Sequence, residues 1–188
     1  MAFWTDMQGQ DPKRQYRWVM RIASIPAYVI KKVSKPSFTV TEVEHKYLNH
    51  TYYYPGRVTW NSVTLTLADP VNPDVANTLS NIVKNSGYTP ALDENDVSTI
   101  SKQDAVNSLG NQIEIVQLDA EGNAIETWKL INPWIKDVKY GELDYEGDEM
   151  TDIELELRYD WATLETANGP ALDTAGGLSV WGLSGDDT

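Results

Sequence analysis

Two histidines and a run of carboxylates are the residues whose types and spacing could carry chemistry. His45 and His50 are the only histidines and stand five residues apart, so a metal site built on them would need further ligands that this spacing does not specify. Asp152, Glu154 and Glu156 alternate with apolar residues, which is typical of a solvent-exposed strand face and not of a catalytic pair. We therefore expect no metal site and no catalytic carboxylates.

Enzyme classes that depend on recognisable motifs are also disfavoured. The chain has no cysteine, and it contains no nucleophile elbow, phosphate-binding glycine loop or HExxH motif. We expect no enzymatic activity and no cofactor. The seven tryptophans and ten tyrosines leave a carbohydrate-binding β-sandwich open, because exposed aromatic rings stack on sugars. Trp18, Trp60, Trp128 and Trp161, however, fall on the apolar sides of alternating strands, as core residues do.

The strand pattern that positions these residues is clearest near the C-terminal end. In this segment charged residues alternate with the apolar Ile153, Leu155, Leu157, Tyr159 and Trp161. One face of the strand should therefore be buried and the other exposed to solvent. Similar alternation, with turn residues between, predicts a mainly β fold, a sandwich or barrel. The expected strands are 16–23 and 27–33 as a first hairpin, 38–43, 58–67, 112–118, 124–131, 138–143 and 151–161.

One flanking helix is expected over Val75–Asn85, with Asp74 as its N-cap and Gly87 at its end. A possible short helix covers Ser101–Leu109. Three parts are predicted at 188 residues: an N-terminal arm at 1–14, a β-domain at 15–161, and a glycine-rich C-terminal extension at 162–188 that lies outside the core.

The net charge of −13 is unevenly spread along the chain. Residues 1–84 carry ten Lys/Arg and six Asp/Glu, whereas residues 85–188 carry five and twenty-two. One interpretation is head-to-tail assembly through opposite charges; the other is that halves of a sequence do not correspond to faces of a fold. The chain has no run of about 20 apolar residues and no signal-peptide layout, so we expect no membrane insertion and synthesis in the cytosol.

The ordered motifs of the chain resemble a known family. They run from RQYRWVMRI through KPSFTV, EHKYLN and PGRVTWNSVTLTLAD to WKLINPW and the final EMTDIELELRYDW. This series resembles the tail tube proteins of contractile-tailed bacteriophages, which are related in architecture to the tubes of type VI secretion and contractile injection systems. The chain departs from shorter family members in its tail at 162–188 and in an insertion at 88–111, which could contact a sheath, brace adjacent rings or mark a tube initiator or terminator.

The resemblance implies a structural subunit that forms hexameric rings, and rings that stack into a hollow conduit for genome delivery. A long hairpin over Phe38–Leu67 would pair with neighbouring subunits, which removes unpaired strand edges. Three adjacent tyrosines on such a segment cannot all be buried in the monomer. The candidate inter-subunit residues of this hairpin are Tyr47, Tyr52, Tyr53, Tyr54 and Arg57.

Two further sets of residues follow from the tube hypothesis. Asp152, Glu154 and Glu156 are candidates for an acidic lumen wall along which double-stranded DNA passes without specific binding, although their strand could equally face outwards. Candidate ring-stacking residues are Lys31, Lys32 and Lys35 at one end and Asp144, Glu146 and Asp148 at the other. The implied partners are further copies of the chain, the tail sheath, and baseplate and tube-terminator proteins. The implied location is the virion tail, assembled in the host cytoplasm.

Overall fold

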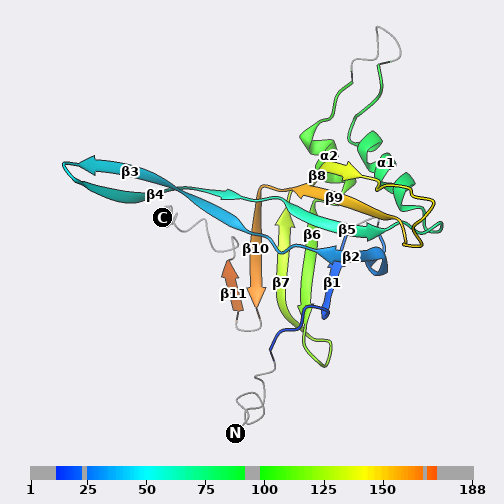
Figure 1. The fold of residues 1–188 in the computed structure, drawn as a ribbon, viewed down its shortest axis with the longest axis horizontal. Coiled ribbons are helices and arrows are strands. Elements are labelled where there is room, and N and C mark those ends of the chain that lie inside the picture. Colours follow the sequence, from blue (N-terminus) through cyan, green and yellow to red (C-terminus); the bar gives the residue numbers. More distant parts are fainter. Residues whose placement is uncertain (1–11, 23–24, 92–97, 167–168, 173–188) are drawn as a thin grey trace, which may run out of the picture.

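The computed structural model describes residues 12–22, 25–91, 98–166 and 169–172. Two antiparallel sheets form the body, and their strands run in crossed directions (Figure 1). The larger sheet has the strand order β1-β6-β7-β10-β11. Its strands are β1 (Trp18–Arg21), β6 (Gln112–Leu118), β7 (Ala124–Ile131), β10 (Trp161–Thr166) and β11 (Gly169–Leu172).

The second sheet has four strands in the order β2-β5-β9-β8. They are β2 (Ile30–Val33), which follows the short 3-10 helix η1 (Ala27–Val29), then β5 (Val63–Ala68), β9 (Asp152–Arg158) and β8 (Trp134–Lys139). The sheets remain open, and the strands that the structure describes close no barrel. The mainly β prediction is confirmed.

The core lies between the sheets because their strands alternate as the sequence predicts. Ile153, Leu155 and Leu157 of β9 are at most 1% exposed, and they pair with the buried Leu67, Leu65 and Val63 of β5. Met20, Ile113 and Leu130 bring the larger sheet into the same cluster. Burial of these side chains supplies the main stabilisation of the body.

Two helices lie at one edge of the body (Figure 1). Helix α1 spans Val75–Asn85 as predicted; the Asp74 side chain accepts a hydrogen bond from the Asn77 backbone N–H at 2.8 Å, and Gly87 follows with a φ of 99°. Helix α2 spans Lys102–Ser108 and is capped by Ser101. The body therefore has the predicted helix α1 and also the short helix α2, which the sequence analysis above gives as a possibility. Among the described residues, no helix is long and apolar enough to cross a membrane.

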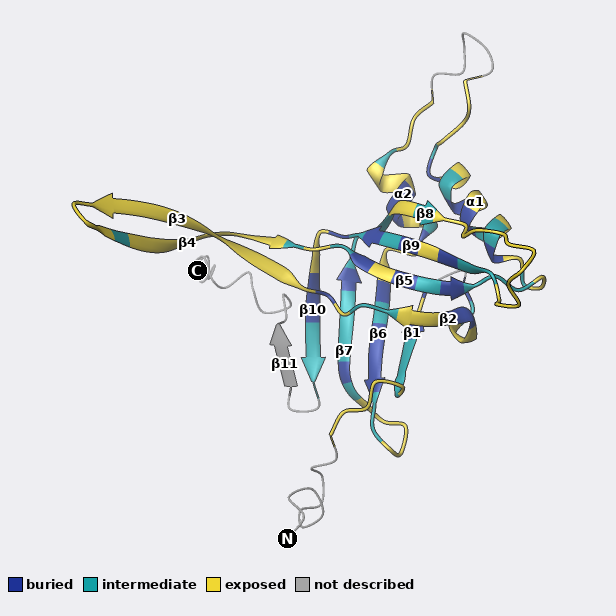
Figure 2. Cartoon of the chain, in the orientation of Figure 1, coloured by how far each residue is buried: buried dark blue, intermediate teal, exposed yellow. Residues whose placement is uncertain are grey.

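A two-stranded hairpin projects from this body (Figures 1 and 2). Its strands are β3 (Phe38–Tyr47) and β4 (His50–Trp60), and among the strands that the structure describes they pair only with each other. The predicted hairpin over Phe38–Leu67 is too long. The hairpin strand ends at Trp60, Asn61 and Ser62 belong to no strand, and β5 is part of the four-stranded sheet. The turn is at Leu48-Asn49. Pro55 and Gly56, a pair of residues typical of turns, lie within β4.

Two other expectations are wrong. Strands β1 and β2 do not form a first hairpin but belong to different sheets. The core does not end at Trp161, because β10 pairs with β7 and Ala162 is 1% exposed, whereas Trp161 itself is 37% exposed. The division into arm, domain and extension stays a prediction; residues 1–11 and 173–188 lie outside the described residues.

Candidate assembly interface

The β3–β4 hairpin exposes large apolar side chains along its whole length. All of its 21 strand residues are exposed except Thr51 and Trp60, which are partly buried (Figure 2). All three adjacent tyrosines are exposed, which confirms the expectation that they cannot all be buried in the monomer. An isolated two-stranded ribbon is marginally stable in water, so a surface that covered these side chains would stabilise the hairpin. The exposed large apolar residues are Phe38, Val40, Val43, Tyr47, Leu48, Tyr52, Tyr53, Tyr54 and Val58.

The root of the hairpin is fixed to the body by aromatic packing. The ring centroids of Phe38 and Trp60 lie 5.3 Å apart in an edge-on contact, and those of Trp60 and the buried Tyr159 lie 6.0 Å apart. Asn61 donates a side-chain hydrogen bond to the Ser37 hydroxyl at 3.1 Å. The direction in which the hairpin leaves the body is therefore set by packed side chains, whereas its outer half has no contact of this kind with the body.

A β-bulge lies midway along the hairpin. Val40 pairs with Val58 and Glu42 with Pro55, so Gly56 and Arg57 stand opposite Thr41. The Thr41 hydroxyl accepts a hydrogen bond from the Arg57 N–H at 2.9 Å. A Cβ on Gly56 would stand 2.3 Å from Thr41 Oγ1 and 2.9 Å from the Thr41 carbonyl oxygen, so this position requires glycine. Arg57, an expected interface residue, is thus part of the bulge.

The candidate lumen carboxylates all have lysine partners in the same chain. Lys31 Nζ lies 2.7 Å from Asp152, Lys136 Nζ 2.7 Å from Glu156, and Lys139 Nζ 3.5 Å from Glu154. Lys136 on β8, with the Ser62 hydroxyl, holds the pKa of Glu156 below its usual value. The outer face of β9 therefore carries cross-strand ion pairs instead of a row of unpaired acids.

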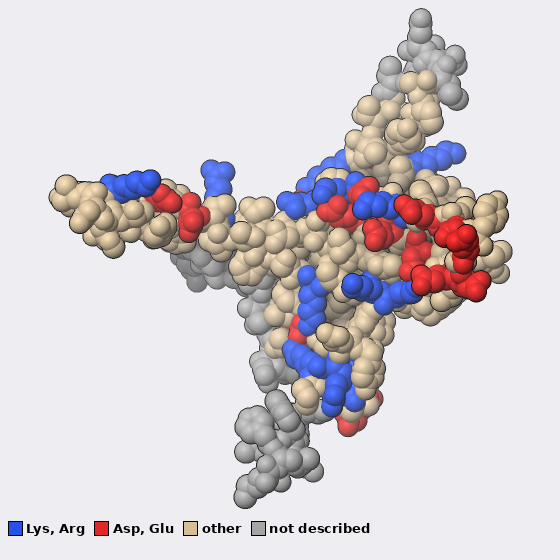
Figure 3. Space-filling model, viewed as in Figure 1, with Lys and Arg blue, Asp and Glu red and all other residues tan. Residues whose placement is uncertain are grey.

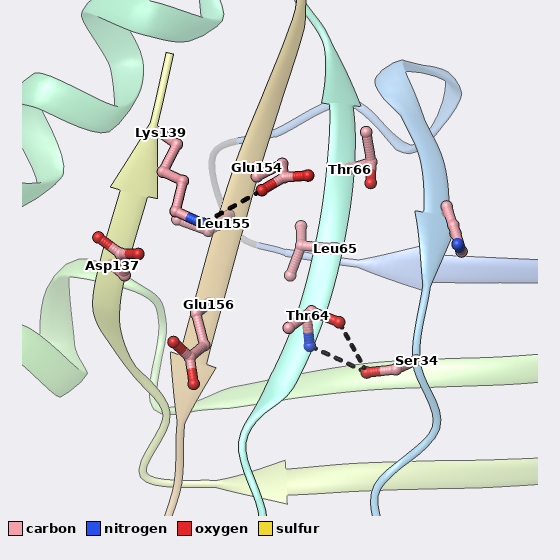
Figure 4. A pocket seen from close by; sticks show the side chains of 10 residues that line it. Ser34, Thr64, Leu65, Thr66, Asp137, Lys139, Glu154, Leu155 and Glu156 are labelled. Carbon is pink, nitrogen blue, oxygen red and sulfur yellow. Dashed lines mark hydrogen bonds and ion pairs between the residues drawn. The ribbon is translucent and has the colours of Figure 1, made fainter. Parts of the chain in front are cut away.

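A shallow hollow of about 260 Å³ lies on this outer face (Figure 4). Threonine hydroxyls from β5 line one side of it, and Glu154, Glu156, Asp137 and Lys139 line the other. Some of the groups that line the hollow pair with one another, as Lys139 does with Glu154 and Thr64 with Ser34. That this face lines a lumen stays a prediction.

Two of the three candidate ring-stacking lysines are bonded within the subunit. Lys31 binds Asp152, and Lys35 binds Glu126 at 2.6 Å and Gln117 at 2.6 Å. Lys32 forms no ion pair with any described residue. The ring-stacking hypothesis puts Lys31 and the acidic loop at opposite ends of the subunit. Asp152 directly follows this loop, so Lys31 and the loop adjoin in one subunit. Figure 3 shows acidic and basic groups side by side there.

The acidic loop between β8 and β9 is exposed. Asp144, Glu146 and Asp148 form no ion pair with the residues that the structure describes, and the Asp144 carboxylate accepts a hydrogen bond only from the nearby Glu146 N–H. Leu143 and Tyr145 are exposed beside them. A role for these residues in ring stacking stays a prediction.

Glu126 is the charged group that the sequence did not indicate. Its side chain is 8% exposed and accepts hydrogen bonds from Lys13, from Lys35 and from Trp128 Nε1, the last two at 2.6 Å. Burial alone would raise the pKa of Glu126, but these three donors and the Lys35 charge lower it to about 2. The cluster ties the segment before β1 and the segment before β3 to β7. Its one sequence signal is that Glu126 alternates with Trp128 and Leu130, so a carboxylate falls on the apolar face of β7.

The histidines lie in the outer half of the hairpin, where His45 pairs with Tyr52 and His50 with Tyr47. The ring centroids of His50 and Tyr52 are 4.7 Å apart. No group of three or more potential metal ligands occurs within the described ranges. The histidines therefore take part in the aromatic surface of the hairpin.

Similar solved structures come from contractile injection systems. A chain in the anti-feeding prophage tube-terminating cap is 17% identical, with a TM-score of 0.62 over 89% of this chain and 100% of that one. A chain in the anti-feeding prophage baseplate is 16% identical, with a TM-score of 0.59 over 83% and 97%. A chain in the sheath-tube complex of an extracellular contractile injection system, PVC, is 16% identical, with a TM-score of 0.54 over 82% and 92%.

These likenesses show a shared fold. No curated protein matches the chain. The family model of the T4-like virus tail tube protein gp19 matches residues 14–163, which include both helices, the projecting hairpin and both sheets except β11 and the second half of β10. The role of the chain is accordingly structural and of the tube type. The chain belongs to the T4-like virus tail tube protein gp19 family.

Proposed function

We propose that the chain is the repeating subunit of a contractile-tail tube, in which hexameric rings stack into a hollow conduit for the genome. The observation that carries the proposal is the projecting hairpin of a tail tube family member, whose exposed strands and apolar side chains have no partner surface in the monomer. Closed ring symmetry gives every such hairpin a neighbour. The function lies in this assembly and involves no catalysis.

The same proposal includes the partners and the location. A tail sheath would surround the tube, and baseplate and terminator proteins would bind its ends, in a virion tail assembled in the host cytoplasm. Double-stranded DNA would pass through without specific binding. The ion-paired outer face of β9 suits such a wall, because paired lysines and carboxylates leave little net charge to hold a polyanion.

A tube terminator is the second candidate, because a chain of similar fold occurs in a tube-terminating cap. The two differ in what they build: a tube subunit adds ring upon ring, whereas a terminator stops at one. A carbohydrate-binding sandwich fits less well, since five exposed aromatic residues gather on the projecting ribbon and none lines the hollow on the sheet.

Negative-stain electron microscopy of the purified protein at increasing concentration tests the proposal. Stacked hollow rings are the expected result. Single rings that never stack would assign the chain to tube termination or initiation. A monomer at every concentration, with or without a baseplate template, would contradict both assignments, and binding to a glycan array would then support the carbohydrate-binding alternative.

A further inference from the structure

The apolar face of the β3–β4 hairpin changes sides midway along its length. In the half next to the body, Phe38 pairs with Trp60 and Val40 with Val58. Paired residues share a face of a ribbon, and alternate residues of a strand do so too. These four side chains therefore form one apolar face. The opposite face carries threonines, with Thr39 paired to Thr59.

In the outer half the arrangement is reversed. The pairs on the Thr39 face are now aromatic or apolar: Val43 with Tyr54, His45 with Tyr52 and Tyr47 with His50. The Phe38 face instead carries charged residues of β3, with Tyr53 and Pro55 opposite two of them. Those charged residues are Glu42, Glu44 and Lys46.

The ribbon also turns over along its length. Figure 1 shows β3 below β4 near the body, then a crossing, then β3 above β4 toward the tip. When the two strands exchange places in a view, the ribbon presents its other face beyond the crossing. The bulge at Thr41, Gly56 and Arg57 lies between the two halves, and bulges increase the right-handed twist that is already large in two-stranded ribbons.

The switch of pattern and the turn of the ribbon offset each other. The apolar face of the root and the apolar face of the outer half consequently lie on one side of the hairpin, and the threonines and charged residues lie on the other, together with Tyr53 and Pro55. Figure 3 agrees with this arrangement, because acidic and basic side chains of the outer half appear on the side turned to the viewer. The apolar side is termed here the strip; it comprises Phe38, Val40, Val58, Trp60, Val43, Tyr54, His45, Tyr52, Tyr47 and His50.

We infer that the strip is one continuous docking surface for a second copy of this chain, and that the bulge is the device that makes it continuous. Seven of its side chains, including four aromatic rings, are about half exposed. They offer about 600 Å² of apolar surface, most of the about 800 Å² that each partner contributes to a stable interface. A patch of this size on a monomer marks an interaction site.

The choice of a second copy rests on the proposed function, in which each subunit has identical neighbours in its ring. A single partner surface must then contact both halves of the hairpin from the same side. Without the turn, the root and the tip would require two partners on opposite sides. The polar side would remain free to face water.

Four aspartate variants on β4 test the strip. Val58→Asp and Tyr54→Asp place a carboxylate on the strip in the root and outer halves, whereas Thr59→Asp and Thr51→Asp place one on the polar side of the same halves. We expect the strip variants to raise the concentration needed for assembly about tenfold or more, and the controls to stay within about twofold. Assembly is measured by sedimentation and electron microscopy, and folding of each monomer by circular dichroism.

The pattern across the four variants decides the outcome. Val58 and Thr51 lie on the same face of the ribbon, the face that carries Phe38. If wild-type protein assembles, Val58→Asp and Thr51→Asp fail to assemble and the other two variants assemble, that face alone binds the partner and the strip is not the docking surface. If all four assemble like the wild type, the hairpin does not dock through these residues, although the tube proposal stands. If wild-type protein never self-associates, the proposed function and the second copy as occupant both fail. Deletion of Gly56, which keeps the pairing but removes the bulge, should impair assembly as strongly as Tyr54→Asp.

Discussion

Strand β9 and the β3–β4 hairpin are built from similar alternating sequences but reach opposite states in the monomer. In β9 the apolar face is buried against the core and the carboxylates on the other face bind lysines. In the hairpin nearly every side chain is exposed. The same local pattern thus gives a strand with a buried apolar face where a second layer of the chain covers it, and an exposed apolar face where the chain has no second layer.

This difference separates two kinds of residue that a sequence alone presents alike. Changes in β9 should affect whether the subunit folds, because its side chains contact others of the same chain. Changes in the hairpin should affect whether folded subunits associate. The four substitutions below test that separation, from the largest expected effect on stability to the smallest.

Leu155→Ala should have the largest effect on folding. Leu155 is 1% exposed and pairs across β5 with the buried Leu65, so the shorter side chain leaves a cavity in the middle of the core. We expect a loss of about 3 kcal/mol in the free energy of unfolding. Urea denaturation followed by fluorescence measures it. A loss below about 1 kcal/mol would mean that the two sheets are not packed as described.

Glu126→Gln should cost about 2 kcal/mol at neutral pH, because glutamine keeps the shape of the side chain but not the charge that Lys35 and Lys13 bind. The folded-state pKa of about 2 is below the ordinary 4.5, so the folded protein holds fewer protons in this range. The charge therefore stabilises the fold fully above pH 4.5, and this stabilisation disappears as the pH falls to about 2.

The measurement for Glu126 is the unfolding free energy of both proteins across that pH range. The difference between wild type and Glu126→Gln should shrink steadily from pH 4.5 downward. A constant difference would assign the effect to packing and not to charge. Glu165→Gln is a suitable control, since Glu165 also binds a lysine, Lys129, but is considerably more exposed than Glu126.

The parts of the fold that the sequence predicts well are those governed by neighbours along the chain. Helix α1 has both of its end signals within the segment, Asp74 as a cap and Gly87 beyond the last turn, and its bounds are confirmed. The buried face of β9 follows from strict alternation up to Tyr159. The family, too, is confirmed by motifs in order along the chain.

The errors occur where distant residues decide. Pro55-Gly56 has the composition of a turn. In a two-stranded ribbon, however, no third strand needs the backbone N–H that proline lacks. The Pro-Gly pair can therefore lie within β4, next to the bulge. The carboxylate partner of Lys31 and the lysine partners of Glu126 are more than 80 residues away along the chain. Alternation shows that Asp152 faces water, but not that a lysine from β2 neutralises it.

Lys136→Met should change stability very little, although it removes the partner of Glu156. Lys136 is half exposed, and exposed ion pairs gain little over hydration. We expect a shift in the unfolding midpoint of less than about 2 °C. A much larger loss would show that the outer face of β9 depends on its ion pairs as the inner face depends on Leu155.

Tyr52→Ser should have the smallest effect on the monomer and a large one on assembly. Tyr52 is 48% exposed, and the only ring contact shown for it is with His50 of the same hairpin. Removing the ring therefore takes no support from the core, and the thermal midpoint should match that of wild type. If the midpoint fell as it does for Leu155→Ala, the hairpin would be part of the folded body. An unchanged midpoint together with lost tubes would show that the tyrosines stabilise only the assembled state, because only there does a second surface cover them.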